Sequence, residues 1–412
     1  MDQQLDRETA AGHVRGHYDS RFAGVVAAFV DNFEQRDEVG ASCALNLEGR
    51  TVVDLWGGRT SRGGAPWQAD TLCTVFSATK GALALSAHML ADYGLLDLDA
   101  PVTDYWPEFG QGGKEGASVA MTLDHSAGVP HVRGPVKPDG FYDYDYMVER
   151  VAAEPAFWEP GTRGGYHAIT MAWTVGELIR RAACRRFGSL FAETVARPLG
   201  LDFWIGAPAA VEPRIAAMIP ATPDEPWLAT RFVQAALAAE ETPTKLFMRD
   251  FLLVDPNAPA CHQAEIGSAN GVTNARGLAG MYAPLANGGS LGGVRLVGAD
   301  TLARMGRVSM ASHDDATLLV PTRFALGYMK SMDNRRLPNV VNSSVLLSEA
   351  AFGHVGAGGS LGFADPACRL SFGYVMNRMG TGLLLNERGQ ALVDAAYDAL
   401  GYRSNTGGAW TA

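Results

Sequence analysis

The feature that most constrains this fold is the position of the strand-like segments, which gather near the two ends of the chain. Near the start, residues 41–47 and 51–56 are β-prone runs joined by a tight turn at Gly49-Arg50, a pattern that predicts an antiparallel hairpin. Four more β-like segments follow residue 320, at 324–329, 351–354, 360–364 and 369–376. The chain between these ends has a helical pattern. We therefore expect one sheet assembled from both ends of the chain, with the helical middle as an insertion.

Apolar residues at helical spacing predict the helices that accompany this sheet. The segments at about 17–36 and 387–400 would flank the sheet as terminal helices. The other predicted helices cover about 77–93, 169–181, 189–196 and 274–286. This order predicts an α+β fold, with an antiparallel sheet flanked by terminal helices and a mostly helical second domain inserted into it.

The expected domain boundaries follow the same change of pattern. Residues 1–76 and 270–412 would form a discontinuous α/β sheet domain, and residues 77–269 would form a mainly helical domain. A chain of 412 residues is long for one hydrophobic core, which agrees with two domains. We expect the active site at the interface between them.

Charge and composition exclude several classes of partner. The net charge of −10 argues against nucleic acid, because a phosphate-binding surface needs clustered Lys and Arg. No apolar run approaches the ~18 residues of a membrane span, so no membrane is expected as a partner. The acidic, polar start lacks the features of a secretory signal, which predicts a cytoplasmic protein. The cysteines are scattered and are expected to be small buried residues: Cys43, Cys73, Cys184, Cys261 and Cys368.

Ser77 and Lys80 carry the strongest chemical signal in the sequence. They are three residues apart at the start of the predicted 77–93 helix, so they would share one helix face. A helix N-terminus supplies free backbone N–H donors and a positive dipole end. A Ser hydroxyl is a poor nucleophile until a base takes its proton. A buried Lys can be that base, because desolvation lowers its pKa. The alternative is an N-capping Ser followed by a solvated Lys.

Two glycine-rich segments are candidates for the rest of a site. Tyr166 lies in a turn-rich stretch, 160–168, where its phenol could carry protons between a nucleophile and a leaving group. It could equally pack its ring in a loop. Residues 352–360 combine a β-like pattern with many glycines, which weaken a strand unless something must approach its backbone. A substrate carbonyl held by backbone N–H groups is one such ligand, and an ordinary turn is the alternative.

Aromatic residues gather in a loop between the first two helices of the middle region. This loop, residues 131–146, is also rich in Gly and Pro, and long loops of this kind are often functional. The loop contains four aromatic residues: Phe141, Tyr142, Tyr144 and Tyr146. These residues, together with Trp158 and Trp204, could either line the wall of a cleft or pack in the core.

Taken in order, these segments resemble the serine β-lactamase and penicillin-binding-protein superfamily, and within it the family VIII carboxylesterases. Ser77 to Lys80 is similar to the Ser-x-x-Lys motif of that superfamily. Tyr166-His167-Ala168 resembles its Tyr motif, and His354-Val355-Gly356 resembles the third motif, on the strand that lines the cleft. Supporting matches lie at 123–130, 273–276 and 285–289. The resemblance extends from about residue 20 to about residue 400.

The resemblance implies a β-lactamase/transpeptidase-like fold and an acyl-enzyme mechanism without a cofactor. Ser77 would attack the substrate carbonyl, Lys80 and Tyr166 would handle its proton, and water would later hydrolyse the acyl-enzyme. By position, the oxyanion donors would be the backbone N–H groups of Ser77 and Ala357. The residues that would line the substrate cleft are His354, Gly356 and Gly358.

Two departures from the family pattern bear on the substrate. Ala168 stands where β-lactamases of this class carry Asn, and His354 stands where they carry Lys. That Lys helps to hold the carboxylate of a lactam, and an imidazole is a poorer anchor at neutral pH. We therefore expect a serine carboxylesterase acting on small or short-chain acyl esters. The alternatives are a β-lactamase or D-amino peptidase, an amide hydrolase, an acyltransferase to an alcohol acceptor, and a non-catalytic binding protein.

Three other patterns point to different chemistry, and each lacks a required part. Ser360 lies in a Gly-x-Ser-x-Gly pattern, but the nucleophile elbow of α/β-hydrolases needs a His after the Ser, and none follows. His13 and His17 could share a helix face, but no third metal ligand is evident, so no metal is expected. Lys114 follows two glycines, yet no Ser or Thr follows it to complete a phosphate loop.

Overall fold

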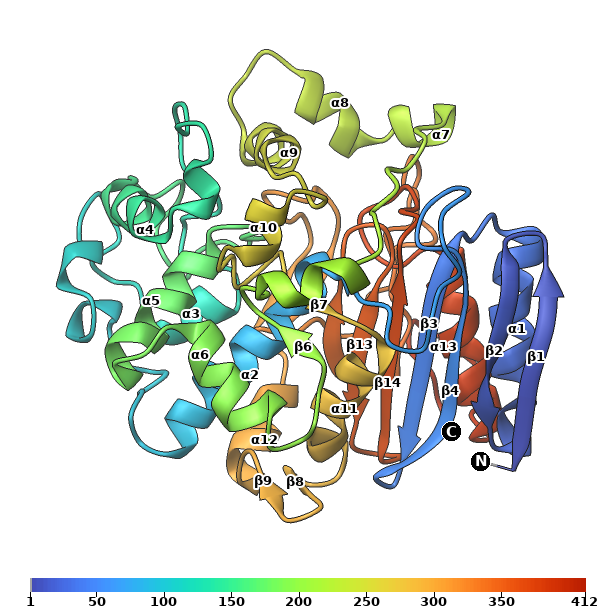
Figure 1. The fold of residues 1–412 in the computed structure, drawn as a ribbon. Coiled ribbons are helices and arrows are strands. Elements are labelled where there is room, and N and C mark those ends of the chain that lie inside the picture. The colour runs from blue at the N-terminus through green and yellow to red at the C-terminus, as the bar shows by residue number, and fades with distance from the viewer. Residues whose placement is uncertain (1) are drawn as a thin grey trace.

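The computed structural model describes residues 2–412 and contains one large antiparallel sheet built from both ends of the chain (Figure 1). Its seven strands lie in the order β1-β2-β4-β3-β14-β13-β12. Their bounds are Gln3–Thr9 (β1), Gly12–Tyr18 (β2), Gly40–Leu47 (β3), Arg50–Gly58 (β4), Phe352–Val355 (β12), Leu361–Asp365 (β13) and Leu370–Met376 (β14). The β14 strand pairs with β3, from Leu370 opposite Leu47 to Met376 opposite Ala41. The predicted assembly of one sheet from both ends is therefore confirmed.

The sheet is wider at the N-terminal edge than the sequence predicted. The hairpin of β1 and β2 extends it beyond β4, with Val14 opposite Gly57. The predicted helix over 17–36 starts too early, because the first α-helix, α1, spans Ala23–Gln35. His13 and His17 consequently lie on β2 and not on a helix. Most side chains of this hairpin are exposed, so it carries no apolar periodicity that would reveal it.

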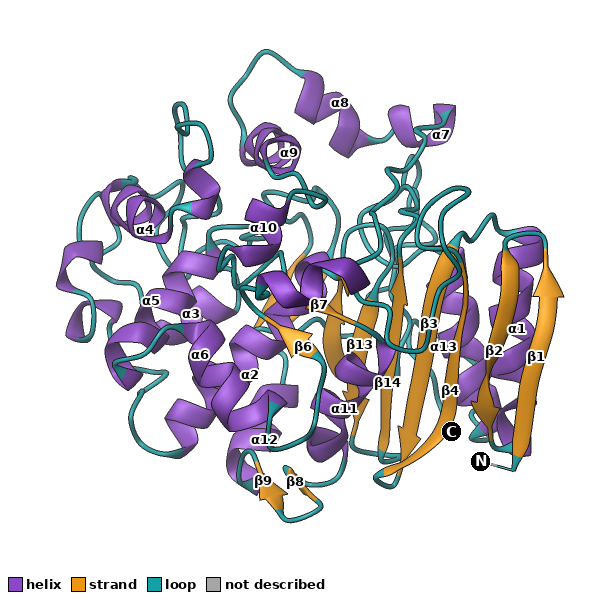
Figure 2. Ribbon diagram, viewed as in Figure 1, coloured by secondary structure: helices purple, strands orange, loops and turns teal. Residues whose placement is uncertain are grey.

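Helices cover both faces of the sheet (Figure 2). On one side α1 packs against α13, which spans Glu387–Ala399, and on the other α11, Ala275–Ala286, packs on β14 and β13. Every residue of β14 is buried. Gly373 permits the close approach of α11, because a Cβ there would lie 2.2 Å from the Ala275 carbonyl oxygen. The centre of the sheet is thus a core element on both faces.

The helical region lies beside the sheet, around α2 (Figures 1 and 2). Helix α2 spans Lys80–Asp92, and every residue from Lys80 to Leu90 is buried. The other helices are α3 (Val119–Leu123), α4 (Tyr144–Ala153), α5 (Met171–Ala183), α6 (Phe187–Phe191), α7 (Glu225–Leu228), α8 (Arg231–Leu237), α9 (Pro243–Leu253), α10 (Pro259–Gln263) and α12 (Ala299–Gly306). The short strands are β5 (Cys73–Thr74), β6 (Phe203–Trp204), β7 (Val272–Thr273), β8 (Ser290–Leu291), β9 (Val294–Arg295), β10 (Met310–Ser312) and β11 (Thr322–Phe324). The division into two domains stays a prediction.

Several local predictions differ from the structure. Part of the expected loop at 131–146 is helix α4, whose N-cap Asp143 accepts a hydrogen bond from the Tyr146 N–H. The strand expected over 324–329 ends at Phe324, because the chain turns there and Phe324 itself bridges Met329. Cys184 is exposed and Cys368 is half-buried, whereas all five cysteines were expected to be buried. No helix among residues 2–412 has the length and apolar character needed to cross a bilayer.

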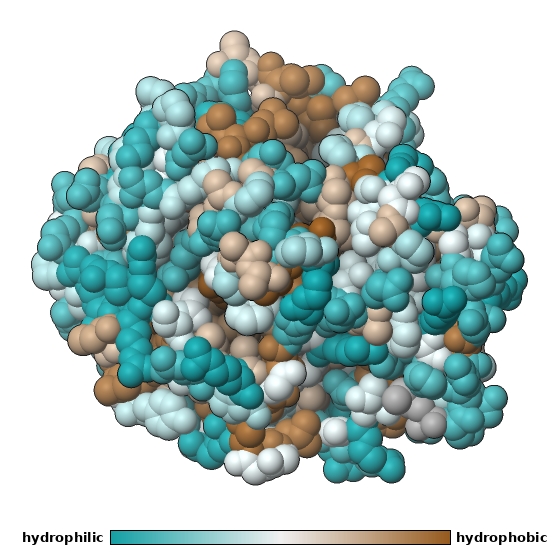
Figure 3. Space-filling model, viewed as in Figure 1, coloured by the Kyte–Doolittle hydropathy of each residue, from teal (hydrophilic) through white to brown (hydrophobic). Residues whose placement is uncertain are grey.

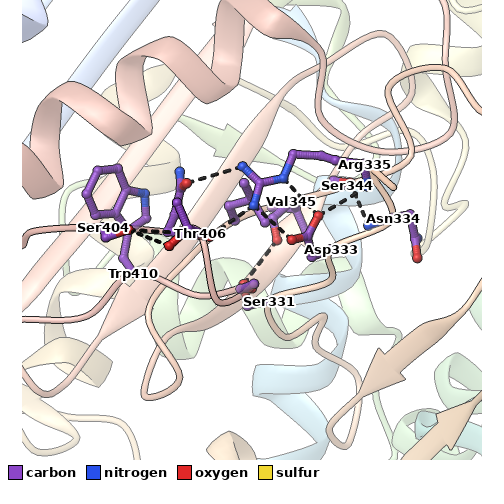
Figure 4. A network of polar contacts seen from close by, with 12 residues as sticks. Ser331, Asp333, Asn334, Arg335, Ser344, Val345, Ser404, Thr406 and Trp410 are labelled. Atoms are coloured by element: carbon purple, nitrogen blue, oxygen red, sulfur yellow. Dashed lines mark hydrogen bonds and ion pairs between the residues drawn. The ribbon is translucent and has the colours of Figure 1, made fainter. Parts of the chain in front are cut away.

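The C-terminal segment is attached to the loop that precedes β12 (Figure 4). Arg335 donates a hydrogen bond to the Asn405 carbonyl at 3.0 Å, and the Ser331 hydroxyl donates to the Gly408 carbonyl at 2.8 Å. Trp410 donates its indole N–H to Asp394 on α13 at 3.0 Å. These contacts hold the last residues against α13 and against the loop that precedes β12.

Candidate active site

Ser77 lies in a strained turn between β5 and α2. The turn is a 3₁₀ segment over Phe76–Thr79, so Ser77 precedes the α-helix and is not in its first turn as predicted. Phe76 has a φ of 44°, in the left-handed region that non-glycine residues seldom occupy. Such strain persists only where the surrounding structure holds it, and it is common at functional sites. The turn presents the Ser77 side chain to a cavity.

The Lys80 amine lies within hydrogen-bonding distance of the Ser77 hydroxyl. Its Nζ lies 3.1 Å from Ser77 Oγ and also donates hydrogen bonds to the carbonyl oxygens of Ala168, at 2.6 Å, and Ser268, at 3.0 Å. The side chain has no exposed surface, and burial lowers the pKa of Lys80 well below its usual value of 10.5. The two carbonyls orient the amine toward the hydroxyl, and its lowered pKa suits it to accept a proton.

Tyr166 completes the group that the sequence predicted. Ser77 and Tyr166 both line the cavity, and the buried Lys80 Nζ lies 4.9 Å from the centre of the Tyr166 ring. Burial raises the pKa of the phenol above its usual 10, and the nearby Ser77 side chain counteracts part of that rise. Tyr166 is therefore protonated at neutral pH. The ring stacks on Phe324 with 5.9 Å between centroids, which holds its plane.

Asp315 positions Tyr166 through the main chain, and the sequence prediction did not include it. Its carboxylate accepts hydrogen bonds from the backbone N–H groups of Tyr166, Thr317 and Leu318, at 3.0, 2.9 and 2.8 Å. The carboxylate is fully buried, and that burial raises the pKa of Asp315, while the hydrogen bonds counteract it. An Asp that accepts N–H groups two and three residues later is a common turn motif. Asp315 differs from other Asp residues in such turns only by its tertiary contact with the Tyr166 backbone.

His354 lies behind Tyr166 and does not line the cavity, in contrast to its expected place in the substrate cleft. It has no exposed surface, and its ring centre is 6.0 Å from that of Tyr166. Its Nδ1–H donates to the Val355 carbonyl at 2.7 Å, so Nε2 carries the free lone pair and has no partner among residues 2–412. Burial lowers the pKa of His354 to about 3, and Lys80 contributes. This imidazole is neutral and cannot anchor a carboxylate by charge.

Two residues of the cavity lining have main-chain N–H groups without a partner within residues 2–412. Within residues 2–412, the N–H groups of Ser77 and Ala357 donate to no other protein group, and both residues line the same cavity. The glycines around Ala357 explain the geometry, because a Cβ at Gly356 would lie 2.2 Å from the Val75 carbonyl oxygen and 2.2 Å from Ser360 Oγ. Ser360 is buried and donates to the Val75 carbonyl at 2.9 Å. Its role is structural, in agreement with the rejection of a nucleophile elbow.

The cavity in front of Ser77 is apolar, with a volume of about 390 Å³. Gly356 and Gly358 line it as expected, and no lining residue is charged. Most of the opposite wall comes from residues 220–254, which the sequence reading did not single out: Trp227, Leu228, Phe232, Val233, Phe247, Met248, Phe251 and Leu252. Figure 3 shows the hydrophobic surface over α8 and α9 that belongs to this wall.

The aromatic residues proposed from the sequence as a cleft wall lie elsewhere. Phe141 stacks on Trp173 in the helical region, with 5.9 Å between ring centres. Trp158 packs its ring edge against His167, and Trp204 packs at the margin of a small separate cluster. Of the two interpretations from the sequence, packing in the interior is the one that fits these residues, and none of them lines the cavity. Aromatic content alone did not reveal which loop folds over the site.

Comparisons with known proteins agree with this fold. The family profile described as Beta-lactamase matches residues 22–397. The esterase/beta-lactamase LipL of Mycobacterium tuberculosis is 36% identical over 391 residues, which cover 93% of this chain and 87% of that protein. The crystal structure of a family VIII carboxylesterase superposes with a TM-score of 0.80 and 39% identity, covering 94% of this chain and 99% of that one. A penicillin-binding protein homologue from Caulobacter crescentus superposes with a TM-score of 0.83 and 32% identity, covering 94% and 99%.

The fold and the site define a serine hydrolase whose sheet, helical region and Ser-x-x-Lys turn have the β-lactamase arrangement. The chain belongs to the beta-lactamase family, and it is similar over nearly its whole length to esterases of that family.

Proposed function

We propose that this protein is a carboxylesterase that hydrolyses small, uncharged, short-chain acyl esters through an acyl-enzyme on Ser77. The observation that carries the proposal is the buried cluster of Ser77, Lys80 and Tyr166 at the floor of an uncharged cavity. The relatives named as esterases support the ester class. The roles of the individual residues follow from their chemistry.

The first half-reaction begins with Ser77. Its hydroxyl attacks the carbonyl carbon while the Lys80 amine, 3.1 Å away, takes the proton. The negative charge that develops on the carbonyl oxygen is accepted by the free N–H groups of Ser77 and Ala357. Because these donors are held in place before the reaction, they need no reorganisation as the charge forms. Two preorganised donors of this kind are worth several kcal/mol, at roughly 3 kcal/mol each.

Tyr166 is the proposed acid for the leaving group. Its raised pKa keeps the phenol protonated, so it can donate to the alkoxide as the ester C–O bond breaks. The Lys80 ammonium, whose Nζ lies 4.9 Å from the centre of the Tyr166 ring, then returns the serine proton to the phenolate. Water enters after the alcohol leaves, loses its proton to the same pair and attacks the acyl-enzyme. The acid is released and Ser77 is restored.

The cavity favours neutral esters over substrates that carry a carboxylate. No Lys or Arg lines it, and transferring an unpaired carboxylate from water into an apolar site is costly. His354 replaces the cationic anchor of the lactamases with a neutral imidazole. Ala168 contributes its carbonyl to Lys80 in place of an Asn side chain. We therefore expect slow turnover of nitrocefin relative to esters, although one relative is named both as an esterase and as a beta-lactamase.

The test is a pre-steady-state assay with p-nitrophenyl acetate. We expect a burst of p-nitrophenolate equal to the concentration of Ser77, and a mass increase of one acetyl group in the wild type but not in Ser77→Ala. Absence of both turnover and acylation would contradict the proposal and would favour a non-catalytic binding protein. Amide and acyl-acceptor substrates in the same assay separate the amidase and acyltransferase alternatives. The cytoplasmic location and the exclusion of nucleic acid and membrane partners stay predictions.

A further inference from the structure

The cavity at Ser77 has a second, much smaller lobe. This small lobe has a volume of about 60 Å³, against about 390 Å³ for the large lobe. Four residues line both lobes: Ser77, Phe247, Phe251 and Ala357. The two phenylalanine rings therefore divide the space. The nucleophile and the two free N–H donors lie at the junction, where a substrate carbonyl carbon must sit, so the two substituents of that carbon must enter different lobes.

The position of the acid decides which substituent enters which lobe. Tyr166 lines the large lobe and not the small one. The leaving oxygen must lie within hydrogen-bonding reach of the group that protonates it. The alcohol part of the ester therefore extends into the large lobe, and the acyl part is left with the small one. This step rests on the proposed function, in which Tyr166 protonates the leaving group.

The small lobe is closed by residues that leave little room for an acyl chain. Its end is formed by Ile169, Val254, Pro256, Cys261 and Ala269. Asp250 is its one carboxylate, and it is already bonded to His131 Nδ1 at 2.8 Å and to Arg249. The lobe therefore offers no free charge to a substrate. An acyl group of two or three carbons fits this description, and a long chain does not.

We infer that the enzyme is selective for esters of short acyl groups with larger apolar alcohols, the small lobe holding the acyl group and the large lobe the alcohol. Acylation forms the bond between Ser77 Oγ and the acyl carbon and breaks the bond from that carbon to the alcohol oxygen. The proton of Ser77 leaves with the alcohol by way of Lys80 and Tyr166. Water then cleaves the acyl–Ser77 bond, so the products are a short carboxylic acid and a bulkier alcohol.

A pair of isomeric esters tests the assignment. Hexyl acetate and ethyl hexanoate have the same formula and nearly the same hydrophobicity, but they place the long chain on opposite sides of the carbonyl. We expect kcat/KM for hexyl acetate to exceed that for ethyl hexanoate by about 10-fold or more, since a misfit of several methylenes costs at least this much. Equal rates, or a preference for ethyl hexanoate, would overturn the assignment while leaving the esterase intact. If neither isomer nor p-nitrophenyl acetate were hydrolysed, the proposed function would fail as well.

Variants of the two lobes provide a second measurement. Val254→Ala enlarges the small lobe and should raise the relative rate on ethyl hexanoate, whereas Ala221→Phe fills part of the large lobe and should lower the relative rate on hexyl acetate. Leu95→Ser is the matched control, because Leu95 lies outside residues 220–254, is 51% exposed and lines neither lobe. The ratio of the two rates should not change in this control. A shift in the opposite direction in either lobe variant would contradict the assignment.

Discussion

The floor and the wall of the cleft are held together in different ways. On the floor, Lys80 and Tyr166 are buried and bonded to distant parts of the chain: the Lys80 amine donates to the Ser268 carbonyl, and the Tyr166 backbone N–H donates to the Asp315 carboxylate. The wall, residues 220–254, consists of three short helices, each begun by a side-chain cap: Asp224, Thr230 and Thr242. Leu228 and Leu252 of this wall are 46% and 75% exposed. The chemistry thus depends on a network that tolerates little change, and the choice of substrate depends on a wall that tolerates more.

Removing the Lys80 amine from the floor of the cleft should have the largest effect on activity. We expect Lys80→Met to lower kcat/KM for p-nitrophenyl acetate by on the order of 10⁴-fold, because the base is lost from the acylation step. Lys114→Met is a matched control, since Lys114 is also fully buried and donates to three backbone carbonyls, those of Gln111, Ala152 and Glu154.

Both Lys substitutions leave buried carbonyls without a donor, which should cost about 1–3 kcal/mol of unfolding free energy each. Urea titration measures the loss of unfolding free energy. Steady-state kinetics on the folded protein measures the loss of kcat/KM. If Lys114→Met lowered kcat as much as Lys80→Met, the loss would come from removing any buried Lys and not from removing the catalytic base.

Removing the phenol hydroxyl of Tyr166 should have the next largest effect on activity. Tyr166→Phe keeps the ring on Phe324 and should lower kcat by about 10²-fold, since only the proton transfer is lost. Stopped-flow measurement of acylation with alkyl and p-nitrophenyl esters sharpens this result. Alkoxides need the acid more than p-nitrophenolate does, so the loss should be larger for alkyl esters. An equal loss for both leaving groups would argue against Tyr166 as the acid.

Acid should destabilise the protein through its buried imidazoles. Burial lowers the pKa of His88 to about 4, of His167 and His354 to about 3, and of His125 well below 6.5. The unfolded chain takes up protons below about pH 6.5 while the folded chain does not, so this contribution to stability is complete above pH 6.5 and falls as the pH decreases toward about 4 for His88 and about 3 for His167 and His354. Each such His should cost about 2 kcal/mol at pH 5.

Urea midpoints at pH 7.5 and 5.0 measure this dependence. His88→Gln provides the comparison, because His88 is remote from the catalytic group and its Nε2 bonds to the Leu326 carbonyl. The variant should lose less stability than the wild type between the two pH values. A pH dependence that is identical in the two proteins would show that His88 is not protonated on unfolding.

The smallest effect on stability is expected from substituting an exposed residue of the wall. Leu253→Ser changes a side chain that is 51% exposed, so the unfolding free energy should change by no more than about 0.5 kcal/mol. Leu246, on the same helix α9, is 2% exposed, and Leu246→Ser should cost about 3 kcal/mol or more. Thermal unfolding of the two variants compares them directly. Similar losses would show that the wall is as tightly packed as the floor.

Much of the fold could be read from local pattern. The hairpin at 41–56, the strands after residue 350, and the helices beginning near Lys80, Ala275 and Glu387 agree with the structure because their apolar periodicity is strong. The β1–β2 hairpin was missed, since its stability comes from pairing with β4 and not from an apolar pattern. Helix α4 was missed because its aromatic residues and preceding turns resemble a loop.

The groups that could carry the chemistry were identifiable from the amino-acid sequence alone. Ser77 and Lys80 are close in the chain, so helical geometry alone brings them near each other, and the segments of Tyr166 and Ala357 carry recognisable motifs. Only the tertiary structure decided that Asp315 holds Tyr166, that His354 lies behind it, and that residues 220–254 close the cavity. These relations join residues up to about 190 positions apart, and their energies arise from burial and close contact, which no local pattern encodes.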